Sequence, residues 1–242
     1  MVSLIFHCIP IMNVIMEEWE DTAFICKKNN MATREIHRIT GSIKRDYSYK
    51  SNTEAGMSKK QADAVLGVED KIRNRKTEVA YVVDADGNIN PEGSPMVGSG
   101  SSSRARVNLS KIPENSVIVH NHPMIKGATG LGRDVGVSLS GSDIRSAIRT
   151  NAKEIRAVSE NYVYSIKRPA GGWNVHYTTG NVINDAIKWR ADDMVKDLRR
   201  RGVITEANSS LYLGRVNALA SHTVIREYAK KYGWTYTRRK SN

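Results

Sequence analysis

The chain has 242 residues, enough for one full core domain with extensions or for two small domains. Its 37 Lys and Arg against 25 Asp and Glu give a formal net charge of +12, which favours acidic partners such as nucleic acid without establishing one. Only two cysteines occur, Cys8 and Cys26. A disulfide framework is therefore not indicated, and we expect a reducing compartment, the cytoplasm.

The first 16 residues are apolar, but they have no basic leading region and no small-residue cleavage site, so a signal peptide is not expected. The stretch contains Pro10 and is shorter than the about 20 residues that a membrane helix needs, so no membrane association is expected. Two interpretations stay open. The stretch docks on the core as a strand or helix, or translation begins later, at Met16 or Met31.

We interpret residues 1–57 as a partly helical N-terminal extension that ends in a polar linker. Ser58 is a plausible N-cap for the helix that follows. Hydrophobic periodicity then predicts, in chain order, a helix over 59–75, strands over 78–84, 104–109 and 117–119, a helix over 142–151 and strands over 155–159, 162–167 and 173–177. Asp86-Gly87 predicts a hairpin turn after the first strand. This mixture indicates an α+β fold with a curved mixed sheet flanked by helices.

The segment Val117–Pro123 carries the strongest chemical signal. Its β-branched apolar residues predict a buried strand, and Pro123 ends that strand. His120 and His122 are two residues apart, so their side chains lie on the same face of extended backbone. The two imidazoles can therefore reach one metal ion. Such an ion needs further ligands, and Asp143 at the start of the next predicted helix is a candidate.

Five positions of defined chemistry occur in one order: Glu78, then His120-Asn121-His122-Pro123, then Ser140 with Asp143 three residues later. This order resembles the JAMM/MPN metallohydrolases, and within them the RadC-like and phage-type branch. The resemblance covers about residues 58–178 and implies an MPN/cytidine-deaminase-like metal-binding domain. One departure is the enlarged loop Met124–Leu139, which we interpret either as a surface insertion or as a lid that grips substrate.

The resemblance also implies a role for each residue. His120, His122 and Asp143 would hold Zn²⁺, which keeps one position for water. Glu78 would be the general base that takes a proton from the water and returns it to the leaving amine. Ser140 would donate a hydrogen bond to the developing oxyanion. The implied reaction is hydrolysis of an amide or isopeptide bond in a peptide or protein substrate.

Each of these residues also has a structural interpretation. The two histidines can be a pair packed within a sheet, and Glu78 can be an exposed charge at a strand end. Ser140 and Asp143 match a capping box, which is compatible with a ligand role because a helix start is rigid. MPN-type folds also occur as binding modules or scaffolds without the metal site, and RadC-like proteins keep a nucleic-acid-associated function open.

Residues 179–242 are predicted to form a helical C-terminal extension with a basic tail. Helical spacing predicts helices over 184–200 and from 205 to 232, followed by the tail over 234–242. Two basic clusters, 199–201 and 238–240, flank several aromatic residues. These aromatic residues either stack on nucleic-acid bases or hold the helix to its core. The sequence does not indicate an oligomeric state.

Overall fold

The computed structural model describes residues 56–90, 96–97, 112–123 and 137–240. The strands are β1 (Val79–Val83), β2 (Ile89–Asn90), β3 (Met96–Val97), β4 (Val117–Asn121), β5 (Glu154–Val158), β6 (Tyr162–Lys167) and β7 (Thr235–Lys240). The helices are α2 (Lys59–Ile72), α3 (Gly141–Arg149), α4 (Thr179–Arg200) and α5 (Ser209–Tyr232), with a 3-10 turn η2 (Glu206–Asn208) before α5. The predicted α+β class is therefore confirmed.

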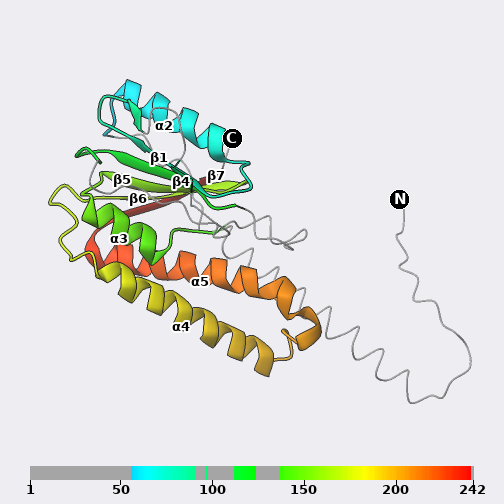
Figure 1. Cartoon of the computed structure of the whole chain (residues 1–242). Helices are drawn as coiled ribbons and strands as arrows, with labels where there is room; N and C mark the ends of the chain where they lie inside the picture. Colours follow the sequence, from blue (N-terminus) through cyan, green and yellow to red (C-terminus); the bar gives the residue numbers. More distant parts are fainter. Residues whose placement is uncertain (1–55, 91–95, 98–111, 124–136, 241–242) are drawn as a thin grey trace, which may run out of the picture.

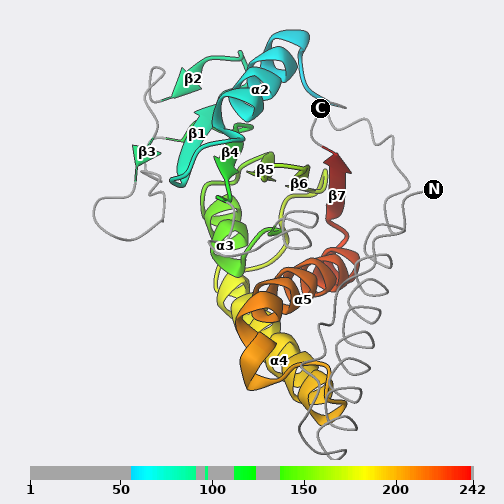
Figure 2. The same ribbon diagram turned by 90° about the vertical axis from the view of Figure 1, so that its right-hand side faces the viewer.

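The strands form one open mixed sheet in the order β2-β1-β4-β5-β6-β7, and β3 also pairs with β1 (Figures 1 and 2). Strands β4 and β5 are parallel, whereas every other neighbouring pair is antiparallel. Parallel neighbours need a crossover connection, and α3 lies within the connection from β4 to β5. This topology places the start of α3 at the same end of the sheet as the C-terminal end of β4.

Helices cover both faces of the sheet (Figures 1 and 2). Helix α2 packs on one face against a cluster that includes Val117 and Val119 of β4. Helices α3 and α5 pack on the other face against a cluster that includes Ile118. Because side chains alternate along a strand, His120 lies on the same face as Ile118, toward α3. Helices α4 and α5 pack against each other around a further apolar cluster.

Two local signals gave correct predictions at the start of the described chain. The hydroxyl of Ser58 caps α2 by accepting the backbone N–H of Gln61 at 3.1 Å. The predicted hairpin turn joins β1 to β2, and the carboxylate of Asp84 accepts the N–H of Asn88 at 2.8 Å across it. Gly87 adopts a φ of +80° in this turn, a conformation that suits glycine.

Two other predictions are wrong. Residues 173–177 form no strand. Trp173 and Val175 pack against the core from irregular backbone, and the indole N–H of Trp173 donates to the carbonyl of Ala152 at 3.1 Å. Most of the expected basic tail is instead strand β7, which pairs with β6 and completes the sheet edge. The aromatic residues among the basic clusters, Tyr228, Tyr232, Trp234 and Tyr236, pack against the core.

Several predictions lie outside the described residues. They are the N-terminal extension up to residue 55, the strand over 104–109 and the loop over 124–136. The proposed domain limits at residues 58 and 178 stay predictions. None of the described helices combines the length and the apolar character that a membrane-spanning helix requires.

Candidate metal centre

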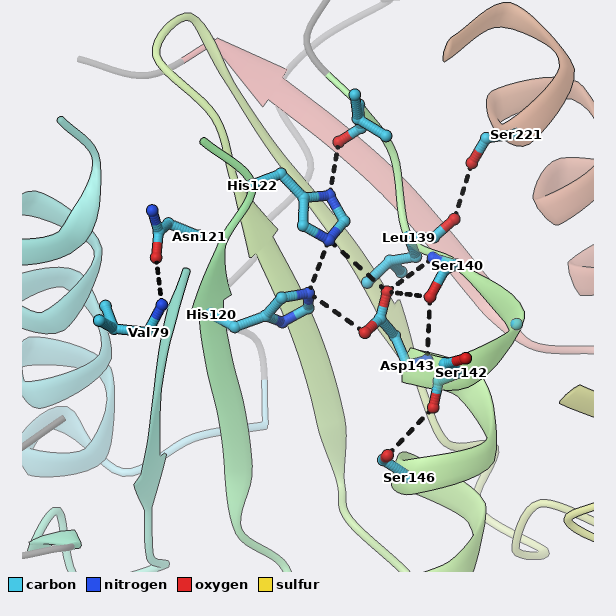
Figure 3. A network of polar contacts seen from close by, with 12 residues as sticks. Val79, His120, Asn121, His122, Leu139, Ser140, Ser142, Asp143, Ser146 and Ser221 are labelled. Atoms are coloured by element: carbon cyan, nitrogen blue, oxygen red, sulfur yellow. Dashed lines mark hydrogen bonds and ion pairs between the residues drawn. The ribbon is translucent and has the colours of Figure 1, made fainter. Parts of the chain in front are cut away.

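The two histidines point toward each other at the end of β4. The Nε2 atoms of His120 and His122 lie 3.0 Å apart, and the ring centroids are 4.7 Å apart (Figure 3). His120 belongs to β4, whereas His122 directly follows the strand, with its backbone N–H donating to Val158 of β5 at 2.8 Å. The pairing with β5 therefore continues past the end of β4 and fixes the backbone that carries both rings.

Asp143 reaches the same place from the first turn of α3. Its Oδ1 lies 3.3 Å from Nε2 of His120, and its Oδ2 lies 3.7 Å from Nε2 of His122. Ser140 holds the carboxylate in this position, because its backbone N–H and its hydroxyl donate to Oδ2 at 2.6 and 2.8 Å. The hydroxyl also accepts the N–H of Asp143 at 3.2 Å, so the predicted capping box is confirmed.

Glu78 approaches the histidines from the start of β1. Strands β1 and β4 are antiparallel with Ala80 opposite His120, and the same register continued outward sets Glu78 opposite His122. The ligand atoms of Glu78, His120 and His122 all lie within 4.8 Å of one another, so this group can hold a metal ion. The structure thus brings Glu78, both histidines and Asp143 together from three elements.

Asn121 fixes the chain on both sides of Glu78. This buried side chain lies between the two histidines in the sequence and points to the opposite face of β4, toward α2. Its Oδ1 accepts the N–H of Val79 at 2.8 Å (Figure 3). Its Nδ2 donates to the carbonyls of Arg75 and Thr77, both at 3.2 Å. The residues before and after Glu78 are therefore hydrogen-bonded to one amide.

The charges in the site act on the three central groups in different directions. Burial disfavours the charged form of His120, but the carboxylate of Asp143, with help from Glu78, outweighs burial and raises the pKa of His120. Burial and the neighbouring charge of His120 lower the pKa of His122. Burial opposes ionisation of Asp143, yet the two imidazoles and the N–H of Ser140 hold the pKa of that carboxyl well below its usual range.

Two imidazole nitrogens and a carboxylate are donors that can hold a metal ion, zinc among them. Two atoms that are each about 2.0–2.2 Å from a tetrahedral zinc ion lie about 3.3–3.6 Å from each other. The two Nε2 atoms lie 3.0 Å apart, and the contacts to Asp143 are 3.3 Å to Oδ1 and 3.7 Å to Oδ2, so the distances fall on both sides of this range. Nδ1 of His122 lies 3.1 Å from the carbonyl of Val137, a contact that places the proton on Nδ1 and leaves Nε2 to bind metal.

The sequence predicted the converging residues and the capping box of Ser140 and Asp143, but not the contributions of Asn121 and Val137. Asn121 carried a signal that could have been used, because a polar residue on the inward face of a buried strand requires hydrogen-bond partners. Val137 carried none, because its contribution is a backbone carbonyl. Comparison with known proteins adds no assignment: no protein-family model, no curated protein and no solved structure matches this chain.

Proposed function

We propose that the protein is a zinc-dependent hydrolase of amide or isopeptide bonds. The observation that carries this proposal is the meeting of His120, His122 and Asp143, which contribute two imidazole nitrogens and a carboxylate within 3.7 Å. Imidazole and carboxylate are ligands that catalytic zinc sites use, with a further position kept for substrate or water. When bound, zinc supplies Lewis acidity that polarises a carbonyl and makes a water more acidic.

Glu78 and Ser140 would supply proton transfer and ligand orientation at this site. Glu78 lies close enough to the ligand nitrogens to accept a proton at the site and to pass it to a leaving amine. Ser140 donates its hydroxyl to Asp143, which orients that ligand. The predicted contact of Ser140 with an oxyanion requires its hydroxyl to rotate away from Asp143 and toward the substrate.

The arrangement also supports the resemblance to the JAMM/MPN hydrolases. The histidine pair ends a strand, the aspartate opens the following helix, and the glutamate begins the neighbouring antiparallel strand. Membership of that family, an MPN-like fold and a peptide or protein substrate are proposals that rest on these residues and their order.

Metal analysis and peptide cleavage test the proposal together. Purified protein should contain one zinc ion per chain, and the variant with His120→Ala and His122→Ala should contain none. A mixture of quenched fluorescent peptides and a lysine-isopeptide probe should be cleaved by the wild type. Glu78→Gln should keep its zinc and lose about 10²–10⁴-fold in rate, because it removes the proton acceptor.

Three outcomes discriminate between the candidate functions. Equal, near-zero zinc in the wild type and in the double-histidine variant overturns the metal centre. Bound zinc without cleavage of either probe overturns the hydrolase and favours the binding-module alternative. Cleavage that persists in Glu78→Gln removes Glu78 from the proposed mechanism.

A further inference from the structure

Four consecutive residues, Val137–Ser140, contact two of the candidate ligands, His122 and Asp143. The carbonyl of Val137 lies 3.1 Å from Nδ1 of His122, and Ser140 donates twice to the carboxylate of Asp143. The segment belongs to no helix or strand, so no ladder of backbone hydrogen bonds sets its position. A shift of this segment would therefore disturb a hydrogen-bond partner of His122 and of Asp143 together.

The two middle residues of the segment are held from the side of the C-terminal elements. The hydroxyl of Ser138 lies 2.7 Å from that of Tyr236 in β7. The hydroxyl of Ser221 in α5 donates to the carbonyl of Leu139 at 2.7 Å (Figure 3). Ser138 and Leu139 are both 0% exposed, so water does not compete for these hydrogen bonds.

A buried histidine completes the contact. Nδ1 of His222 in α5 lies 2.9 Å from the hydroxyl of Tyr236, which also meets Ser138. His222 is 5% exposed, and its ring packs edge-on against Tyr164 of β6. Polar groups buried between a helix and a sheet cost free energy unless they are hydrogen-bonded. Here the hydroxyls of Tyr236 and Ser221 direct their hydrogen bonds to the segment that carries the ligand contacts.

We propose that Tyr236 and Ser221 are positioning residues for the metal centre and act through the segment Val137–Ser140. The inference rests on the proposed metal centre, but not on the hydrolytic reaction. Neither side chain is a proposed ligand. Their effect is to fix the carbonyl that orients His122 and the serine that orients Asp143. Helix α5 and strand β7 then help to position the metal ligands.

Zinc affinity measured against a competing chelator tests the proposal. Residues that orient metal ligands typically contribute about 10–100-fold to metal affinity. We therefore expect Tyr236→Phe and Ser221→Ala each to bind zinc at least about 10-fold more weakly than the wild type. Ser221→Thr retains the hydroxyl and should restore most of the loss. If Tyr236→Phe or Ser221→Ala changes the circular dichroism spectrum, Ser138→Ala takes its place. Ser138→Ala removes the same contact between Ser138 and Tyr236 by deleting the serine hydroxyl.

Thr237→Val is the matched control. It removes the contact of 2.7 Å between the hydroxyls of Thr237 and Ser165, which joins the same two strands, β6 and β7, on the opposite face of the sheet. Zinc affinity should stay close to that of the wild type in this variant. Equal affinities in Tyr236→Phe, Ser221→Ala and Thr237→Val would overturn the positioning role.

Hydrogen exchange in protein stripped of metal separates this inference from the proposed function. The backbone N–H groups of Ser140, Gly141 and Asp143 donate to Asp143, Asn184 and Ser140 respectively. These amides should exchange faster in Tyr236→Phe and Ser221→Ala, and at the wild-type rate in Thr237→Val. If the wild type binds no zinc, the metal centre fails while the exchange rates still decide whether the segment is held from the C-terminal side. Unchanged exchange in every variant refutes the inference.

Discussion

His120 and His122 differ in the charges that surround them, although they stand side by side. Asp143 lies nearer to His120, whereas His122 is disfavoured as a cation by burial and by its neighbour. The pair therefore binds its first proton readily and its second reluctantly. Titration steps of this kind belong to the pair rather than to either ring alone.

In protein stripped of metal, we expect two imidazole titration steps, one above and one below the ordinary pKa of 6.5. An imidazole must lose its proton before it can bind a metal. The pKa of His120 is raised, so His120 takes up its proton while the pH is still above 6.5. As the pH is lowered, zinc affinity should therefore start to decrease before pH 6.5 is reached. Ring ¹⁵N shifts and zinc titrations at several pH values measure both effects. Asp143→Asn should move the upper step down, and an upper step that stays in place contradicts the assigned cause.

Asn121 shows how one buried amide can replace several backbone contacts. Asn121→Asp keeps the acceptor for Val79 but turns the donor to Arg75 and Thr77 into a second acceptor. Asn121 is buried, and a buried polar group without a matching partner costs about 1–3 kcal/mol, so this variant should lose at least about 1 kcal/mol in the free energy of unfolding in urea. Asn181→Asp is the control, because this exposed side chain accepts from Arg145 and should change stability by less than about 0.5 kcal/mol.

Helices α3 and α4 begin against each other, and two glycines allow this close approach. A Cβ placed on Gly141 would lie 2.0 Å from the carbonyl oxygen of Gly180, and one on Gly180 would lie 2.3 Å from that of Gly141. Asn184 of α4 also accepts the N–H of Gly141 at 2.8 Å. The start of α3, which carries Asp143, is therefore fixed by α4 as well as by its own capping box.

Gly180→Ala should destabilise the protein by about 1–3 kcal/mol, because the added methyl group forces the two helix starts apart. It should also weaken zinc binding, since Asp143 lies in the first turn of the displaced helix. Gly67→Ala is the matched control. Gly67 lies in α2, and a Cβ added there would have nothing within 4 Å, so alanine should stabilise the protein by about 0.5–1 kcal/mol. Thermal unfolding that ranks the two variants in the reverse order contradicts this account.

A buried network of charges joins the first described helix to the last strand. Arg156 in β5 is 0% exposed, and it donates to Glu69 of α2 at 2.6 Å and to Glu154 at 2.7 Å. Glu69 also pairs with Arg239 of β7. Arg156, Glu69 and Arg239 thus form ion pairs with partners that are far apart in the sequence. The basic cluster at the end of the chain is in part a structural feature.

Glu69→Gln should lower the free energy of unfolding by about 3–5 kcal/mol, because it leaves buried arginine charge with less compensation. Glu227→Gln makes the same substitution in an exposed pair with Arg190 and should cost less than about 1 kcal/mol. Urea unfolding of both variants gives the comparison. A loss in Glu69→Gln no larger than that in the control would show that the network contributes little to stability.

Local patterns were enough to predict most elements and the residues that converge at the candidate metal centre. The period of two along a strand puts His120 and His122 on one face, and the spacing of Ser140 and Asp143 caps a helix, whatever surrounds them. Apolar periodicity identified α2, β1, β4, α3, β5 and β6 to within a few residues. It missed β7, because that edge strand is polar and basic and only Arg238 within it is buried.

Only the folded chain could bring these local features together. The approach of Asp143 to the histidines depends on how α3 packs within the crossover, and that packing depends on the close contact of Gly141 with Gly180. The contact between Ser138 and Tyr236 spans 98 residues, and no local spacing encodes it. Helical and strand periods report which face of an element is buried, but the partner on that face is decided by the packing of the whole core.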